Sequence, residues 1–554
     1  MHALLALTPI LAIFVFLVVL RWPAKRAMPV AWCLTVLIAL LLWEVPFRRV
    51  AAATLNGWIV CAVLLYIVFG AVLLLNTLKE SGAVSAIRQG LLDVSPDRRI
   101  QAIIVAWCFG AFIEGAAGFG TPAAIAGPLL LTIGFPAMAA VTVCLIIQST
   151  PVSFGATGTP IIIGVNNGLS GGDKVVPHLE SIGVAFDDHL LAIAGKVGLI
   201  HGIIGTLIPL FMVCILTRFY GERKSWKEGL EVWRFALLAG LAFTIPYALT
   251  ANFLGPEFPS LVGSMIGLGI CITAARHNFL TPERNWDFPD RNSWPADWMG
   301  AFKGEAAEHE QPMPLLRAWS PYVLVALFLV LTRLNALPFK AWLTSDMVTW
   351  APEILGTDIK GKVQALHLPG SIFIAVVACA CFIQKIKPAQ LNRAVAASSR
   401  TILGTAMALG FAVPLAQIFI HSGTNAAGLQ SMPIELANAA SDIAGDAWPF
   451  FAPTIGALGA FFAGSNTISN MTFSYFQFGV ALNIGVSTVV VVALQAVGGA
   501  AGNMICVHNI VAASATVGLQ GREGPLIRSV AVPLIYYLVF AGLLGLLMIH
   551  AFGG

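Results

Sequence analysis

The sequence predicts an all-α polytopic membrane protein with about 12 transmembrane helices and two oppositely oriented re-entrant hairpins, arranged as an inverted-topology repeat. Three observations support this fold class. Of the 554 residues, 58% are hydrophobic and only 10% are charged, and the mean hydropathy is +0.84. Apolar runs of spanning length follow one another along the whole chain. Two further runs are interrupted by Gly, Pro, Ser and Asn in corresponding positions of the two halves.

The uninterrupted apolar runs define the crossings, because about 20 apolar residues in a helix span a hydrocarbon core of about 30 Å. The first run has no basic segment before it and is followed by RWPAKR, so we expect a first spanning helix rather than a cleaved signal peptide. Full crossings are predicted near 3–20, 28–43, 57–78, 136–166, 191–217, 235–251, 258–275, 319–337, 368–384, 401–420, 480–518 and 529–550.

Basic residues between the runs orient the helices, since Lys and Arg gather on the cytoplasmic side. They cluster in 21–26, 79–99, 218–234, 385–388 and 521–528. These clusters share one side if both termini are periplasmic and if the interrupted stretches 100–134 and 447–478 re-enter the membrane as hairpins. The first hairpin then opens to the cytoplasm and the second to the outside. The Pro- and Trp-containing loop 276–318 becomes a cytoplasmic linker.

Short sequence matches indicate that the two hairpin regions are related. GAFIEG at 110–115 matches GAFFAG at 459–464, and a Gln followed seven residues later by Gly recurs at 148–155 and 495–502. We therefore divide the chain into N-terminal scaffold helices (1–99), a first hairpin and broken-helix transport half (100–217), scaffold helices with the linker 276–318 (218–400), a second hairpin and broken-helix transport half (401–528) and a C-terminal helix (529–554).

Interrupted helices at membrane depth predict a binding site, because non-helical backbone is tolerated there only where protein or a water-filled cavity satisfies it. The glycines of GAAGFGTP and GSNTISN expose N–H groups, which together with helix N-termini form an anion site. Each hairpin is followed by a broken crossing, at 148–160 and 495–509, where prolines and the pair Gly498 and Gly499 interrupt helical bonding. The alternative is a set of helix kinks whose hydroxyls bond back to their own backbone. The predicted carboxylate pocket consists of Gly115, Gly118, Gly120, Thr121, Gln148, Ser149, Thr150, Ser465, Asn466, Thr467 and Asn503.

Glu114 is the first candidate for a proton-coupling residue, because burying a charge within the membrane costs at least ~2.5 kcal/mol and usually serves a function. Burial and a bound carboxylate both favour the neutral acid, so proton and substrate would favour each other's binding. The alternative is a protonated structural group that bridges hairpin backbone. His508 is the second candidate, whereas we interpret His201 as structural and Lys196 as snorkelling to the outer interface. Pocket walls or ordinary packing are the two interpretations for Phe119, Phe461, Phe473, Tyr475 and Phe476.

Three long motifs carry a family resemblance. They are CFGAFIEGAAGFGTPAAIAGPLL at 108–130, TPVSFGATGTPI at 150–161 and AVGGAAGNMICVHNIVAASATVGLQGREG at 496–524. With them the chain resembles, over essentially its whole length, the L-lactate permease family of bacterial lactate and glycolate transporters. The resemblance implies an inner-membrane secondary transporter that imports a 2-hydroxymonocarboxylate, such as L-lactate, D-lactate or glycolate, together with protons.

The hairpins also resemble the wider ion-transporter superfamily, in which Ser-Asn-Thr hairpin tips bind substrate carboxylates and, in dicarboxylate members, sodium. The second half has this tip at 465–467, but the first half has Ala-Ala-Gly at 116–118, which speaks against a symmetric pair of sodium sites. Glu114 adds to the asymmetry, since its repeat partner is Ala463. A sodium-coupled transporter of small carboxylates is the alternative function.

Other function classes lack their signals. The formal net charge of +4 is too small to suggest nucleic-acid binding, and the nine cysteines lack CxxC or Cys/His metal spacing. The sequence contains no HExxH, His-rich metal cluster or Walker GxxxxGK[ST] motif, so we expect no enzyme, no cofactor, no metal and no ATP-driven pump. The expected partners are a small monocarboxylate, a proton and the lipid bilayer, with dimerisation optional.

Overall fold

The computed structural model describes residues 2–20, 22–92, 94–118, 120–300, 313–333, 337–519 and 522–552. It confirms the predicted fold class, because the described residues are overwhelmingly helical and their extended pairings are two isolated bridges, Trp350 with Val363 and Glu353 with Lys360. Within these residues, 9 helices are long and apolar enough to cross a membrane, or up to 10 if one bent pair is a single span.

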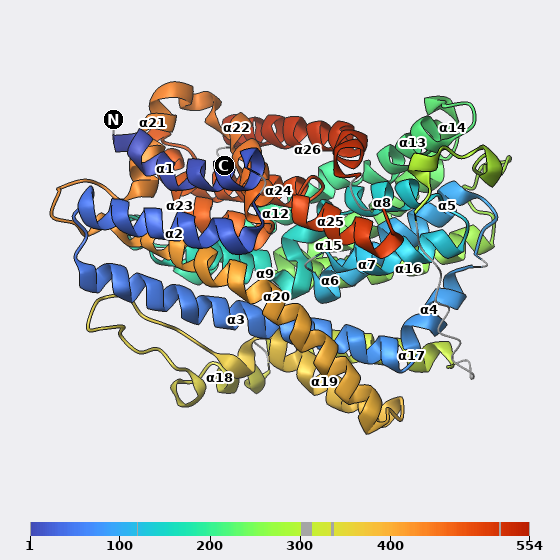
Figure 1. The fold of residues 1–554 in the computed structure, drawn as a ribbon, viewed down its shortest axis with the longest axis horizontal. Coiled ribbons are helices and arrows are strands. Elements are labelled where there is room, and N and C mark those ends of the chain that lie inside the picture. The colour runs from blue at the N-terminus through green and yellow to red at the C-terminus, as the bar shows by residue number, and fades with distance from the viewer. Residues whose placement is uncertain are drawn as a thin grey trace.

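One bundle of helices is formed by the N-terminal segments and by helices from the middle of the chain. Its members are α1 (His2–Phe14), η1 (Val15–Val19), α2 (Ala24–Leu41), α3 (Phe47–Glu80), α4 (Ala83–Leu92), α17 (Leu315–Arg333), α19 (Pro369–Ile383) and α20 (Pro388–Ile420). The long α3 packs along α20 and α19, and α2 packs on α20 (Figure 1). Between Arg49 and Lys79, α3 carries no charged residue, so this helix can cross a bilayer with its charges at the two ends.

Two helical hairpins lie beside this bundle and open toward opposite ends of the molecule, as predicted. The first consists of α5 (Arg98–Ala102), η2 (Ile103–Phe109), α6 (Gly110–Ala117) and α7 (Thr121–Thr132), and the second of α22 (Trp448–Ala463) and α23 (Asn466–Ile484). Both coincide largely with the predicted stretches 100–134 and 447–478, although the first begins at Arg98 and the second continues to Ile484. Their arms meet at Gly118 and Gly120 in the first hairpin and at Gly464 in the second.

Each hairpin is followed by a broken helix. The first contains α8 (Ala137–Ile146), η3 (Thr150–Phe154), α9 (Gly155–Thr159), η4 (Pro160–Val165) and α10 (Asn166–Ser170), and the second contains α24 (Thr488–Gly502) and α25 (Val507–Val517). The first bends by 54°. The predicted interruption at Gly498 and Gly499 is wrong, since α24 continues through both and the break lies at 503–506. The reason is packing, because a Cβ at Gly498 would collide with the Pro453 carbonyl of the neighbouring α22.

The remaining helices surround the hairpins. They are α11 (Val175–Ser181), α12 (Phe186–Gly205), α13 (Ile208–Tyr220), α14 (Trp226–Leu230), α15 (Trp233–Phe253), α16 (Pro259–Arg276), α18 (Pro338–Leu343), α21 (Met432–Ala444) and α26 (Glu523–Phe552). The α16 helix packs on α6 of the first hairpin, while α12 and α26 pack on α24 of the second broken crossing. Both hairpin regions are therefore enclosed by helices from several parts of the chain.

Polar contacts between loops sort the loops into two groups at opposite ends of the molecule. The first group holds the pairs Trp43–Gln430, Lys174–Gln430 and Arg49–Asp358. The second holds Arg393–Glu80, Arg98–Asp287 and Arg522–Asp297. Helix α21 lies toward the left end in Figure 1, and α4 and α14 lie toward the right end. Two pairs of the second group, Arg98–Asp287 and Arg522–Asp297, join the basic segments 79–99 and 521–528 to the loop after α16.

Candidate functional site

A cavity lies where the two hairpin tips meet the two broken crossings. Its walls come from both hairpin tips and both broken crossings: Glu114, Gly118 and Gly120 of the first hairpin, 464–467 of the second, Val152, Gly155, Ala156, Thr159 and Pro160 of the first broken crossing, and Asn503 and Asn509 of the second. The empty volume is about 340 Å³, open space at its mouth included. Four segments that are far apart in the sequence thus contribute to one site.

Positive backbone φ angles turn the chain at both tips. In the first hairpin, Gly118 has φ +63° and Gly120 has φ +73°, and Gly464 has φ +73° in the second. This left-handed region favours glycine because it has no Cβ. At the first tip the Thr121 hydroxyl donates to the Gly118 carbonyl, so this predicted binding hydroxyl stabilises the turn.

Helix N-termini converge on the cavity. The α7 and α23 helices begin next to the lining residues Gly120 and Ser465, and neither of these N-cap positions supplies a side-chain cap. The α25 helix begins between the lining residues Asn503 and Asn509. A helix start carries about half a positive charge and unpaired N–H groups, so each of these starts attracts an anion. No Lys or Arg is among the described residues that line the cavity.

Several buried polar atoms at this cavity lack a hydrogen-bond partner in the protein. Among lining residues they are both amide atoms of Asn466, Oδ1 of Asn503 and Oε2 of Glu114. Gln148 and Thr157, which are fully buried beside it, also have unpaired side-chain atoms. Because buried polar groups are nearly always paired, such a concentration indicates groups that bind water or a ligand.

Glu114 is the charged side chain among the described lining residues, and only 3% of it is exposed. Its carboxyl group interacts with the Gln148 amide, although neither amide atom makes a well-formed hydrogen bond. On the other side, a Cβ added to Gly155 would lie 2.6 Å from Glu114 Oε1, so the carboxyl group rests against the unwound crossing. Immediately after Gly155, the non-glycine residues Ala156 and Thr157 have φ of 42° and 52°. Such strain is concentrated at functional sites.

We expect Gly155→Ala to displace the Glu114 carboxyl group and to lower substrate-driven transport in proteoliposomes by about tenfold or more, since shifts of about 1 Å at a functional group are costly. Gly155 has φ −64° and ψ 155°, which alanine adopts readily, so the backbone itself should tolerate the change. The matched control is Gly269→Ala in α16, where a Cβ would have no neighbour within 4 Å. Equal initial rates for both variants would contradict this role of Gly155.

Two of the predicted binding hydroxyls point elsewhere. Ser149 donates to the Ile146 carbonyl at the end of the preceding helix α8 (2.8 Å), so its hydroxyl bonds back to nearby backbone, which is the alternative that the sequence left open. The hydroxyl of Thr150 lies 3.0 Å from that of Tyr537 in α26. Neither residue lines the cavity.

Thr150 belongs to a buried hydrogen-bonded chain that includes His201. Tyr537 Oη lies 2.5 Å from His201 Nδ1, His201 Nε2 lies 2.8 Å from Ser153 Oγ, and Ser153 donates to the Ala496 carbonyl (3.2 Å). A carbonyl accepts and never donates, which sets the direction of the chain: His201 donates through Nε2 and accepts from Tyr537 at Nδ1. With a neutral His201 imidazole, each side chain in this hydrogen-bonded chain has a partner. This supports the structural interpretation of His201. No sequence motif indicated that Tyr537 would bond to His201 and Thr150.

The other predicted residues divide between lining and supporting positions. Gly115 faces α16, where a Cβ would lie 2.9 Å from Ser260, whereas Ser465, Thr467 and Asn503 line the cavity. Sequence reasoning missed Asn509, whose amide donates to the Asn503 carbonyl (3.4 Å). It lies directly after His508 in the third motif, at 496–524. Phe119 and the side chain of His508 lie outside the described part of the chain.

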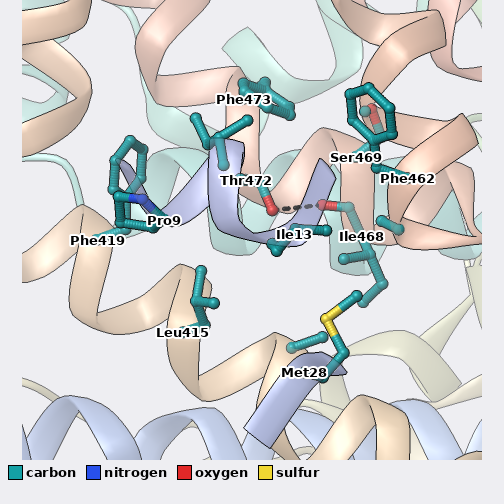
Figure 2. A pocket seen from close by; sticks show the side chains of 14 residues that line it. Pro9, Ile13, Met28, Leu415, Phe419, Phe462, Ile468, Ser469, Thr472 and Phe473 are labelled. Atoms are coloured by element: carbon teal, nitrogen blue, oxygen red, sulfur yellow. Dashed lines mark hydrogen bonds between the residues drawn. The ribbon is translucent and has the colours of Figure 1, made fainter. Parts of the chain in front are cut away.

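A second, apolar crevice lies between hairpin 2 and the neighbouring bundle (Figure 2). It is lined by α1, α2 and α20 on one side and by α22 and α23 on the other, and encloses about 520 Å³ with its mouth. Its two hydroxyls are already engaged, since Thr472 donates to the Ile468 carbonyl (2.9 Å) and Ser469 to the Gly456 carbonyl (2.8 Å). Phe473 lines this crevice instead of the polar cavity. The crevice therefore lacks the groups that an anion needs.

Comparison with known proteins covers both hairpins and both broken crossings. A family model described as L-lactate permease matches residues 2–552. A relative from Haemophilus influenzae bears an L-lactate permease name and is 31% identical over 572 residues, covering 99% of both chains. An L-lactate permease of Escherichia coli is 28% identical and covers 95% of this chain and 92% of its own. A glycolate permease of Escherichia coli is 29% identical and covers 100% of this chain and 97% of its own.

Proposed function

The chain belongs to the L-lactate permease family, and from this premise we propose that it imports L-lactate and related 2-hydroxymonocarboxylates, including glycolate and D-lactate, by proton symport. Relatives named for lactate and glycolate transport support this substrate class. The family membership and the apolar helices make the chain a multi-pass membrane transporter rather than an enzyme. We place it in the bacterial cytoplasmic membrane with both termini in the periplasm.

The observation that carries the proposal is the pairing of one carboxyl group with an anion site that has no cationic side chain among its described lining residues. Converging helix N-termini and unpaired amides suit a substrate carboxylate. An ionised Glu114 would repel that carboxylate across a small cavity, and burial by itself penalises the ionised form. Substrate binding therefore favours the protonated acid, and proton binding favours the substrate. One proton carried with one monocarboxylate moves no net charge.

Sodium coupling is the second candidate, because several unpaired oxygens favour it. The amide oxygens of Asn466, Asn470 and Asn503 are buried without a hydrogen-bond partner. Oxygen atoms of this kind suit a hard cation. The first tip has no equivalent set, since residues 116–118 carry no polar side chain. We therefore rank this mechanism below proton symport.

Purified protein in proteoliposomes that enclose a pH-sensitive dye tests the proposal. We expect external L-lactate to acidify the lumen in sodium-free buffer, and choline in place of sodium to leave the rate unchanged. Uptake of labelled L-lactate that requires sodium and moves no proton would favour the second candidate. An absence of uptake and counterflow with L-lactate, D-lactate and glycolate alike would overturn the substrate class.

A further inference from the structure

We propose that Asn466 recognises the 2-hydroxyl group of the substrate and thereby makes the site selective for 2-hydroxy acids over acids that lack this group. The inference rests on the proposed function of the cavity, and it assigns one step of recognition to one side chain. Asn466 is the first residue of α23, directly after the turn of the second hairpin.

The amide of Asn466 is buried and uncommitted. Only 2% of the residue is exposed, it lines the cavity, and neither Oδ1 nor Nδ2 has a hydrogen-bond partner. Among the described lining residues Asn466 is the amide with both polar atoms unpaired, whereas Asn503 and the nearby Asn470 each leave only Oδ1 unpaired. Asn470 donates to the Pro160 carbonyl (3.1 Å), and Asn509, another lining residue, donates to the Asn503 carbonyl. Gln148 is unpaired as well, but it does not line the cavity.

The neighbouring helix α24 leaves just enough room for this amide. A Cβ at Gly499 of α24 would collide with Oδ1 of Asn466, so glycine at this position permits the observed side-chain position. The amide is therefore held between the hairpin tip and α24 while its polar atoms stay free.

A free amide matches the chemistry of a 2-hydroxycarboxylate. It offers a donor at Nδ2 and an acceptor at Oδ1, and the substrate offers a carboxylate that accepts and an adjacent hydroxyl that donates. Because neither amide atom is committed, either orientation of the amide plane presents one donor and one acceptor. An unsubstituted acid leaves Oδ1 buried and unpaired, and a 2-oxo acid places a second acceptor against it. Sites that hydrogen-bond a substrate hydroxyl reject analogues without it for this reason.

Competition against labelled L-lactate counterflow in proteoliposomes measures the effect, with unlabelled L-lactate, propionate and pyruvate as competitors. For the native protein we expect L-lactate to compete better than propionate by roughly 5- to 150-fold, the factor for one unpaired buried acceptor. Asn466→Ala should bring this ratio to within about threefold of unity, mainly because L-lactate binds more weakly. Gly499→Ala pushes the Asn466 amide aside without removing it. This variant should also bring the ratio closer to unity.

The matched control is Asn483→Ala, an exposed asparagine of the same helix that bonds to Asn438 (2.8 Å) away from the cavity, and its selectivity should equal that of the native protein. If both cavity variants fold and transport but keep the native ratio, the assignment of Asn466 is overturned while the proposed function stands. If the native protein itself fails to transport L-lactate, the proposed function fails first. A native protein that takes L-lactate and propionate equally well also overturns the assignment.

Discussion

The Glu114→Gln protein should exchange L-lactate across the membrane but no longer take up protons with it. Glutamine keeps the size and polarity of a protonated glutamic acid, so the cavity still accepts the substrate carboxylate, but the side chain has no proton to release. In the dye-loaded proteoliposomes, lactate-driven acidification should fall to the level of protein-free liposomes. Counterflow of labelled against unlabelled L-lactate should survive, because exchange needs no net proton movement.

The matched control is Glu257→Gln, another buried carboxyl group, which pairs with Arg333 (2.6 Å) and does not line the cavity. An amide oxygen still accepts from Arg333, and the number of protons carried per lactate should be the same as in the native protein. Proton uptake that persists in Glu114→Gln would exclude Glu114 as the coupling group and direct attention to His508. Loss of counterflow together with proton uptake would instead give Glu114 a role in substrate binding.

Arg99→Met should lower the free energy of unfolding by about 3–5 kcal/mol, because removal of one partner leaves a buried charge uncompensated. The Arg99 side chain is 0% exposed and its partner Asp97 is 1% exposed, with Nη2 and Oδ2 2.7 Å apart. Arg99 also donates to the Arg284 carbonyl (2.9 Å) and thereby ties the base of hairpin 1 to the loop after α16. The midpoint of unfolding in detergent, followed by circular dichroism, measures the loss.

Arg98→Met is the control for this prediction. Arg98 pairs with Asp287 (3.0 Å), and these side chains are 23% and 62% exposed, so the expected loss is about 1 kcal/mol or less. The double variant Asp97→Asn/Arg99→Met removes both charges and should be more stable than the sum of the two single changes predicts. Equal midpoints for Arg98→Met and Arg99→Met would show that the buried pair contributes no more than an exposed one.

Much of the fold followed from local composition. The crossings, the two interrupted stretches and the side shared by the basic loops each depend on windows of about 20 residues, and hydropathy and charge decide such windows. The Gly498 and Gly499 pair shows where this reasoning fails. Glycines in a hydrophobic segment permit a break in the helix, but they also permit close approach of a neighbouring helix. Here the second effect holds, because the Pro453 carbonyl of α22 lies where a Cβ of Gly498 would be.

The candidate site was predicted only in part, because hydrogen-bond partners depend on which helices become neighbours. Thr150 was assigned to the pocket, yet its hydroxyl lies on Tyr537, which is 387 positions away in the sequence. Asn466 was assigned for its motif, whereas its unpaired amide became visible only once α24 was packed behind it. Asn509 was missed because nothing in its immediate sequence places it opposite Gly120.

The sequence by itself determined a polytopic helical protein of the L-lactate permease family, with a charge kept at Glu114 against the cost of membrane burial. Hydropathy, charge and long motifs are properties of the chain, so they can be read before it folds. Only the tertiary structure decided which of the predicted side chains line the cavity and which polar atoms there stay unpaired. A hydrogen bond forms over about 3 Å between groups that folding brings together, so their selection depends on the packing of helices that are distant in the sequence.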